Sequence, residues 1–208
     1  MNALSRCRSV TVMARSGRPR SFDEADVVEH AKDVFWHRGY RASSMRELTD
    51  ATGVLPGSVY AAIGDKHALF LRALALYAED TRRAAADLAR GPDVVSRLRG
   101  LLTSVLSAAV GSPGRGCMLG NTAAELLPGD DGAATIVRDA LRDLEASIAE
   151  AIESAQRQGE IASDVNSTSQ AVLLVALMQG LHVVARTEAD PQRLHDAIDT
   201  AMQPLQRS

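Results

Sequence analysis

The stretch of sequence that decides the fold is Gly39-Tyr-Arg-Ala-Ser-Ser-Met-Arg-Glu-Leu-Thr-Asp-Ala-Thr-Gly53, followed by Gly57-Ser-Val-Tyr60 and Gly64-Asp-Lys66. It predicts a short helix over residues 44–52, for which Ser43 or Ser44 supplies the N-terminal cap. Glu47 stands at capping-box spacing from Ser44, so that each side chain can bind the other residue's backbone N–H. The helix therefore has a defined start.

A second short helix follows after a tight turn. Gly53 ends the first helix, because glycine readily adopts the left-handed conformation at that position. Pro56 suits the first turn of the next helix, predicted over residues 56–63, because the N–H that proline lacks has no partner there in any case. Two short helices joined by a tight turn that contains glycine form a helix-turn-helix unit.

The rest of the chain beyond residue 22 also has the periodicity of amphipathic helices. Apolar positions recur along the first of them, where we expect Phe35 and Trp36 in the core. No stretch alternates with a period of two for long enough to be a strand, so the predicted fold class is all-α. The predicted helices cover residues 23–38 (or from residue 21), 44–52, 56–63, 65–90, 94–110, 117–127, 133–158, 167–188 and 191–205.

These helices predict an arm and two domains. Residues 1–20 form a basic, disordered arm, residues 21–82 a domain with the helix-turn-helix, and residues 83–208 a larger helical domain. The arm carries five arginines and no acid, whereas residues 67–208 carry 13 basic and 18 acidic side chains. A basic end on an acidic body suits nucleic-acid binding, although the overall pI is near 6.0.

The remaining composition indicates a cytoplasmic protein without a cofactor or a metal site. Cys7 and Cys117 are too few and too far apart for a disulfide framework, which favours a reducing compartment. The longest nearly apolar run, residues 171–185, is too short and too polar to span a bilayer. Met13 opens a polar stretch of its own, and we hypothesise that translation begins there.

The quoted residues resemble the N-terminal DNA-binding domain of TetR-family transcriptional regulators, over roughly residues 18–80. Residues 116–127 and 176–181 resemble the C-terminal regulatory half of one branch of that family. The resemblance implies that residues 21–82 are the DNA-binding domain and that residues 83–208 serve effector binding and dimerisation. The resemblance implies a one-component regulator, a repressor in the expected case. Such a homodimer binds double-stranded operator DNA of palindromic sequence and releases it when a small-molecule effector enters the C-terminal domain.

The resemblance also implies which residues meet DNA. Ser58 and Tyr60 stand where family members touch bases and phosphates, and Lys66 stands where the family grips a backbone phosphate. Tyr60 packed against the first helix and Lys66 as a solvated surface charge are the alternatives. Arg18 and Arg20 in the arm are expected to reach a neighbouring minor groove, or else to make no contact.

Three further residues belong to the expected DNA interface. Ser44 with its helix N-terminus offers N–H groups to a phosphate. Gly57 lets the backbone approach the DNA closely, and Arg46 adds a phosphate or base-edge contact. The sequence departs from the family where polar readers are common. Apolar contact with thymine methyl groups is expected there from Ala61 and Ala62.

The effector pocket is expected in residues 78–208, which contain no aromatic residue. Its walls would then be aliphatic, which disfavours flat cationic ligands and favours a small aliphatic or reactive molecule. His182 as an ordinary buried histidine and Glu125 as a partner of an arginine or a backbone group are the alternatives. The candidate pocket or sensor residues are Cys117, Met118, Asn121, Thr122, Glu125, Gln179 and His182.

Cys117 is the candidate reactive group. It follows Arg115 and begins a helix, and both the arginine and the helix dipole would lower the pKa of the thiol. A cysteine at a similar position senses electrophiles or oxidants in related repressors of the N-ethylmaleimide-reductase type, whereas many free cysteines are only small buried apolar residues. An enzyme that uses Cys117 with His182 or His195 as base is an alternative function without a recognisable motif. A ligand-independent architectural DNA binder is another.

The two C-terminal helices, over residues 167–188 and 191–205, are the expected dimer interface. Their apolar content exceeds what one helix can bury alone, and two helices from each subunit would form a four-helix interface. The alternative is that these apolar faces close a core within one chain.

Overall fold

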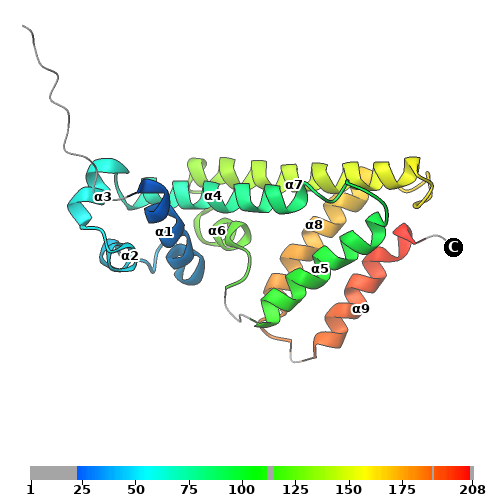
Figure 1. The fold of residues 1–208 in the computed structure, drawn as a ribbon. Helices are drawn as coiled ribbons and strands as arrows, with labels where there is room; N and C mark the ends of the chain where they lie inside the picture. The colour runs from blue at the N-terminus through cyan, green and yellow to red at the C-terminus, as the bar shows by residue number, and fades with distance from the viewer. Residues whose placement is uncertain (1–22, 112–114, 189, 207–208) are drawn as a thin grey trace, which may run out of the picture.

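The structure is a computed structural model that describes residues 23–111, 115–188 and 190–206. These ranges contain helices and no strand, which confirms the predicted all-α fold class (Figure 1). The helices are α1 (Glu24–Arg38), α2 (Met45–Thr52), α3 (Pro56–Ala62), α4 (Lys66–Ala85), α5 (Val94–Gly111), α6 (Met118–Leu126), α7 (Asp131–Arg157), α8 (Ser167–Val184) and α9 (Pro191–Met202), with a final 3-10 turn (Gln203–Leu205).

The caps around α2 follow from local sequence. The Ser44 hydroxyl accepts the N–H of Glu47 at 3.2 Å, and the Glu47 carboxylate accepts the N–H of Ser44 at 2.9 Å, which confirms the capping box. Ser43 is not the cap, because it is buried and its hydroxyl donates to the carbonyl of Gly39 at 2.7 Å. Gly53 ends α2 in the left-handed conformation.

Two predicted helices run too far. α4 ends at Ala85 and not near residue 90, because the chain turns there and brings Leu88 back into the core around α5. α8 ends at Val184, and the N–H groups of the next residues bond back to its last carbonyls in a tight turn. The prediction continues the first of these helices to residue 90, before Gly91-Pro92, and the second to Glu188.

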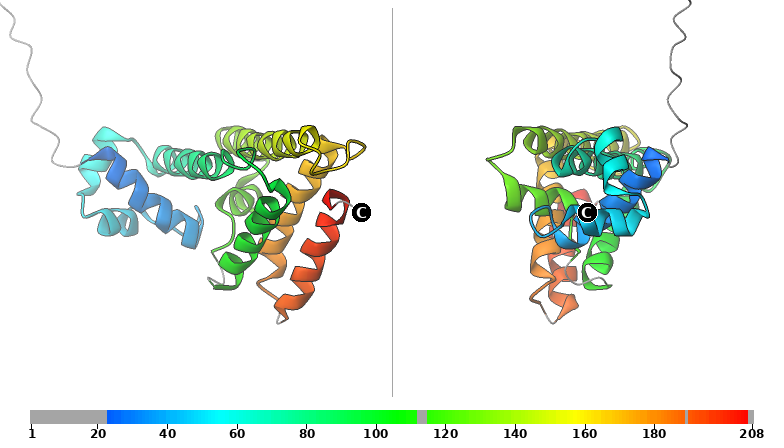
Figure 2. Two further views of the ribbon diagram at one scale, coloured as in Figure 1. Left: turned by 45° about the vertical axis from the view of Figure 1, so that its right-hand side comes forward. Right: turned by 90° about the vertical axis from the view of Figure 1, so that its left-hand side faces the viewer.

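The buried apolar side chains form two clusters, which we call the DNA-side core and the sensor core. The DNA-side core joins α1 to α4 with α6 and the first half of α7, so Leu119 and Val137 pack with Phe70. The sensor core joins α5, the second half of α7, α8 and α9. Hydrophobic packing therefore crosses the boundary expected after residue 82. Figures 1 and 2 show α4 and α7 side by side along the length of the molecule.

Two helices, α5 and α8, are long and apolar enough to cross a membrane by length and composition. Both contribute to the sensor core, where Leu102 of α5 and Leu174 of α8 are buried. An apolar helix in the middle of a soluble bundle passes the same test, and we interpret both as core helices.

Candidate DNA interface and effector cavity

The helix α3 lies at one end of the molecule with its outer face open (Figure 1). Val59 alone is buried on α3 and holds it to the DNA-side core. Tyr60 is 50% exposed, so half of its side chain is accessible at this face. Gly57 is exposed on the same helix, and a Cβ added there would meet no atom within 4 Å. The outer face of α3 is thus accessible to solvent.

Positively charged and capping groups surround that face. Ser44 and Arg46 are exposed at the start of α2, where Arg46 makes a 3.8 Å pair with Asp50. Lys66 begins α4, and its Nζ lies 4.4 Å from the centroid of the Tyr40 ring. Lys66 forms no ion pair with the described acids, so its charge is available. Arg18, Arg20, Met13 and Cys7 lie outside the described residues.

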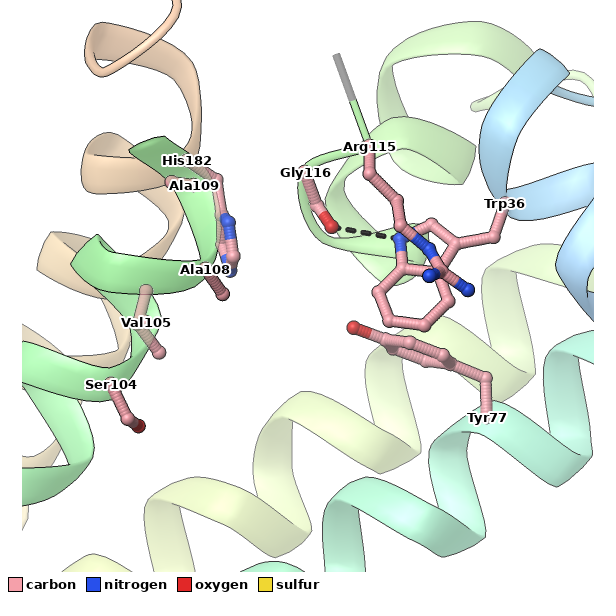
Figure 3. Close-up of a pocket in the computed structure, with 9 residues that line it drawn as sticks. All are labelled: Trp36, Tyr77, Ser104, Val105, Ala108, Ala109, Arg115, Gly116 and His182. Atoms are coloured by element: carbon pink, nitrogen blue, oxygen red, sulfur yellow. Dashed lines mark hydrogen bonds between the residues drawn. The ribbon is translucent and has the colours of Figure 1, made fainter. Parts of the chain in front are cut away.

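A cavity of about 300 Å³ lies between the two ends of the molecule, and we call it the interdomain cavity. On one side are Trp36 of α1 and Tyr77 of α4, with Arg115 and Gly116 from the segment before α6; on the other are His182 of α8 and four residues of α5 (Figure 3). The lining residues are Trp36, Tyr77, Ser104, Val105, Ala108, Ala109, Arg115, Gly116 and His182.

Arg115 and Gly116 connect this cavity to α1. The Arg115 guanidinium stacks on the Trp36 ring at 3.7 Å from its centroid and pairs with Asp33 at 2.5 Å. The Trp36 indole N–H donates to the carbonyl of Gly116 at 2.8 Å (Figure 3). A group that moves Arg115 or Gly116 therefore acts on α1 directly.

The expectation of an aromatic-free pocket is wrong for this cavity. It assumed that the sensor half encloses its own pocket, whereas Trp36 and Tyr77 reach the cavity from α1 and α4. Trp36 is only half-buried, unlike Phe35, and forms part of the cavity wall. Because Arg115 already occupies a face of Trp36, the aromatic wall still offers no free cage for a cation.

The structure does not gather the seven predicted pocket residues in one place. His182 lines the interdomain cavity, whereas Met118 and Thr122 are buried on α6 and Met118 belongs to the DNA-side core. Gln179 lies against Gly120, where an added Cβ would come within 2.5 Å of its Oε1. None of these three residues is in the cavity lining, and Met118 is instead buried in the DNA-side core.

Asn121 and Glu125 connect α6 to its neighbours. Asn121 donates to the carbonyl of Arg115 at 2.8 Å and accepts from Arg186, in the turn after α8, at 2.9 Å. Glu125 accepts the backbone N–H groups of Tyr40 at 2.9 Å and Arg41 at 2.6 Å, in the turn between α1 and α2. The backbone-capping alternative for Glu125 is therefore confirmed.

Cys117 is buried at the N-cap position of α6, and its Sγ accepts a hydrogen bond from the Tyr77 hydroxyl at 3.8 Å. Burial of the phenol and the nearby Cys117 sulfur raise the pKa of Tyr77, so the hydroxyl stays protonated and remains a donor. Arg115, which was expected beside the thiol, instead stacks on Trp36 and pairs with Asp33.

The two C-terminal helices divide their apolar side chains between two faces. Val175 and Met178 of α8 and Ile198 of α9 are buried in the sensor core, as the single-chain alternative expects. Other apolar residues of α8 are exposed in the single chain: Val172 (46%), Leu173 (48%), Val183 (65%) and Val184 (44%). A groove between α8 and α9 is lined on the α8 side by Leu173 and Leu177.

A capped helix-turn-helix joined to a helical bundle with a cavity is the architecture of a one-component DNA-binding regulator. Comparison with protein families agrees. Residues 27–73 match the model of bacterial regulatory proteins of the tetR family, and residues 94–201 match the tetracyclin repressor-like C-terminal domain. The chain belongs to the TetR family of transcriptional regulators, which is not a family of enzymes.

Relatives of similar length support the assignment. The HTH-type transcriptional regulator YezE of Bacillus subtilis is 29% identical over 193 residues, which cover 91% of this chain and 99% of the relative. The HTH-type transcriptional repressor ComR of Escherichia coli is 25% identical over 189 residues, covering 89% and 90%. A cysteine-substituted form of the TetR-family regulator CifR, solved in complex with a 26-base-pair operator, has a TM-score of 0.77 and 28% identity, covering 91% of this chain and all of that one.

Proposed function

We propose that this protein is a cytoplasmic transcriptional repressor that binds palindromic operator DNA as a homodimer and releases it when a small molecule occupies the interdomain cavity. The observation that carries the proposal is the composition of that cavity. Its walls include Trp36 of the DNA-binding helix α1 and His182 of the sensor helix α8. A ligand that fits one spacing of these helices better than another shifts the population between DNA-binding and released forms.

The open face of α3 supplies the DNA reader in this proposal. A helix fits the major groove, and Ser58 and Tyr60 stand on α3 with Gly57 allowing close approach. Ser44, Arg46 and Lys66 hold phosphates on either side, and Arg18 and Arg20 extend the contact into the minor groove. Repressor activity is the expected outcome because ComR and CifR are described as a repressor and as an operator-bound regulator.

The exposed apolar face of α8 supports a homodimer. Four large aliphatic side chains lie on one helix beside a groove lined by α9, and contiguous exposed apolar surface of this kind marks an interface. Pairing α8 and α9 of two chains buries it and spaces two α3 helices for a palindrome. Sedimentation tests the dimer: a 22.1 kDa species at micromolar concentration would reject it.

The cavity is tested by filling it. Footprinting of the intergenic DNA next to the gene identifies the operator, and a compound screen for operator release identifies effectors. Ala108→Phe places a ring into the cavity from α5, so we expect normal operator binding and no response to the effector. Ser107→Phe is the matched control, because Ser107 is next to Ala108 in α5 and is exposed but does not line the cavity. An unchanged response in Ala108→Phe would overturn the proposed effector site, and no release by any compound would favour an architectural DNA binder.

Electrophile sensing by Cys117 is the second candidate. It is favoured by one contact: the hydroxyl of Tyr77, which lines the cavity, donates to the Cys117 sulfur. A reactive compound in the cavity would thus lie one side chain away from the thiol. Labelling with iodoacetamide as a function of pH, together with operator release, tests it. A Cys117→Ser protein that still responds to the effector excludes this mechanism.

A further inference from the structure

The lining of the interdomain cavity has one charged side chain, Arg115, and no carboxylate among its described residues. Residues 112–114, which precede Arg115 outside the described ranges, are serine, proline and glycine and add no charge. Asp33, which lies outside the lining, already pairs with Arg115 and balances its charge. The described lining itself offers no carboxylate to a cation, so it disfavours a cationic ligand.

Two hydrogen-bonding atoms at this cavity lack a protein partner. In the described part of the chain, three buried side-chain nitrogens have none: Arg97 Nε, Arg115 Nε and His182 Nδ1. Two of the three belong to residues that line the interdomain cavity from opposite sides (Figure 3). Buried polar atoms in native proteins are nearly always paired, and a ligand that turns these two side chains toward the cavity would supply both partners.

The other contacts of Arg115 leave it able to bind a ligand. Its pairing with Asp33 runs through Nη2, and a guanidinium has five N–H groups, so the Nε–H remains free for an acceptor. Arg186, in the turn after α8, adds a positive charge near His182; its guanidinium donates to Asn121, and it forms no ion pair with a described acid. Because Asp33 balances the charge of Arg115, Arg186 leaves one net positive charge around the cavity.

His182 contributes a hydrogen bond without a second charge. Burial, with a smaller effect of Arg186, lowers the pKa of His182, so its imidazole is neutral near pH 7. A neutral imidazole can carry its proton on Nδ1 and donate it. Arg115, Arg186 and Asp33 together carry one net positive charge, which with the neutral His182 donor matches a single negative charge.

The volume of the cavity and its α5 wall limit the size and the polarity of the rest of the ligand. A volume of about 300 Å³ holds roughly ten groups of the size of water in a liquid. Val105, Ala108 and Ala109 of α5 make an apolar surface without a charge. The ligand that fits is compact and carries an apolar body beside its charged group.

We propose that the effector is a compact monocarboxylate whose oxygens accept hydrogen bonds from Arg115 Nε and His182 Nδ1 and whose apolar body rests on α5. The proposal rests on the proposed function and names the chemical class of its effector. Because Arg115 also holds Asp33 and stacks on Trp36, a carboxylate bound there acts on α1 through the same side chain. A ligand bound to Arg115 can therefore move α1 through this one side chain, without a longer series of contacts.

The test compares ligands of one shape and different charge. The probes are carboxylates with phenyl, cyclohexyl and short alkyl bodies, the uncharged amides of the same acids, and the matching amines. Operator binding and thermal unfolding are measured with the full-length protein. We expect at least one acid to weaken operator binding and raise the melting temperature, its amide to act about tenfold more weakly or less, and its amine not to act.

Variants locate the effect. Arg115→Gln should remove the preference for acid over amide, and Arg115→Lys should retain part of it because the charge remains. Arg97→Gln is the matched control, because Arg97 also has an unpartnered Nε but bonds to Gly91 away from the cavity. If Arg115→Gln unfolds, His182→Ala in place of it should lower the affinity for the acid with little effect on operator binding.

The outcomes separate this inference from the proposed function. Amides or amines that release the operator as well as the acids, or a panel of acids of which none binds, would overturn the carboxylate assignment. A preference for acids that survives both Arg115→Gln and His182→Ala would overturn the site. The proposed function fails separately, when compounds that release the operator still do so in Ala108→Phe.

Discussion

The helix-turn-helix and the interdomain cavity are built in opposite ways. The helix-turn-helix uses caps and turns that lie within a few residues of each other, such as Ser44 with Glu47 and Gly53 with Pro56. The cavity is assembled from α1, α4, α5, α8 and the segment before α6. The difference shows that the DNA reader is a local structure, whereas the effector site depends on how the two ends of the molecule pack together.

The largest effect is expected where the two ends share a core. Leu119 of α6 is fully buried in the DNA-side core, although α6 lies outside the helix-turn-helix. Leu119→Ala should lower the free energy of unfolding by about 2–5 kcal/mol, because it leaves a cavity. Hydrogen exchange should accelerate most in α1 and α4. Acceleration confined to α8 and α9 would contradict the shared core.

Glu125 tests the connection between α6 and the turn before α2. Glu125→Gln keeps the shape but removes the charge that accepts the N–H groups of Tyr40 and Arg41. We expect a loss of about 1–2 kcal/mol in unfolding free energy and weaker operator binding, measured by denaturation and by fluorescence anisotropy. Glu150→Gln on the exposed side of α7 is the control. Equal behaviour of the two variants would show that Glu125 does not position the DNA-binding helices.

Lys66 probes the DNA side alone. If Lys66 grips a phosphate, Lys66→Ala weakens operator binding and reduces the slope of its salt dependence by about one unit. Lys66 also contacts the Tyr40 ring, so weaker binding by itself does not identify a phosphate contact. The slope of the salt dependence does, because a cation–π contact within the protein releases no counterions when DNA binds. Arg157→Ala, at the far end of α7 in Figure 1, should leave the slope unchanged. A slope that Lys66→Ala does not alter removes the residue from the interface.

The smallest effect concerns acid stability at the junction of α4 and α7. Asp130 caps α7 through the N–H of Ala133 and pairs with His67 of α4 at 2.6 Å. The Ala133 hydrogen bond has the largest effect on the pKa of Asp130 and lowers it; burial, second in size, opposes this, and the hydrogen bond and charge of His67 lower the pKa further, to a net value below the ordinary one. Its contribution to stability is therefore present above the unfolded pKa of about 3.9 and lost as pH falls through the lower folded value.

Asp130→Asn should accordingly cost stability at neutral pH and progressively less as the pH falls below about 4. Chemical denaturation at several pH values measures the difference between the variant and the wild type. Asp139→Asn, on the exposed side of the same helix, serves as control. A difference that stays constant down to the acid range would show that the Asp130 carboxylate has no linked contribution.

The sequence was sufficient for the local part of this architecture. The Ser44 capping box, the all-α fold and the starts of α3 and α4 are set by neighbouring residues, and the structure confirms them. The alternative that Glu125 caps a backbone group is also confirmed, although the sequence could not name Tyr40 and Arg41 as its partners. Partners distant in the chain depend on packing that periodicity does not encode.

The cavity was predicted poorly for the same reason. The absence of aromatic residues after position 77 is real, but Trp36 and Tyr77 enter the cavity from the other half of the chain. One signal was present: Trp36 lies beside the apolar stripe of α1 and not within it, which is typical of a side chain with a partner in another segment. Arg115 gave no comparable signal, because its role depends on the turn before α6.

Trp36 also provides the most direct test of the central claim that a ligand between α1 and α8 controls operator binding. It is the single tryptophan of the chain, lines the cavity and bonds to Gly116. Its fluorescence should therefore change when an effector binds, with the same concentration dependence as release of a labelled operator. An effector that releases the operator without changing Trp36 emission, or with a different midpoint, would contradict the account.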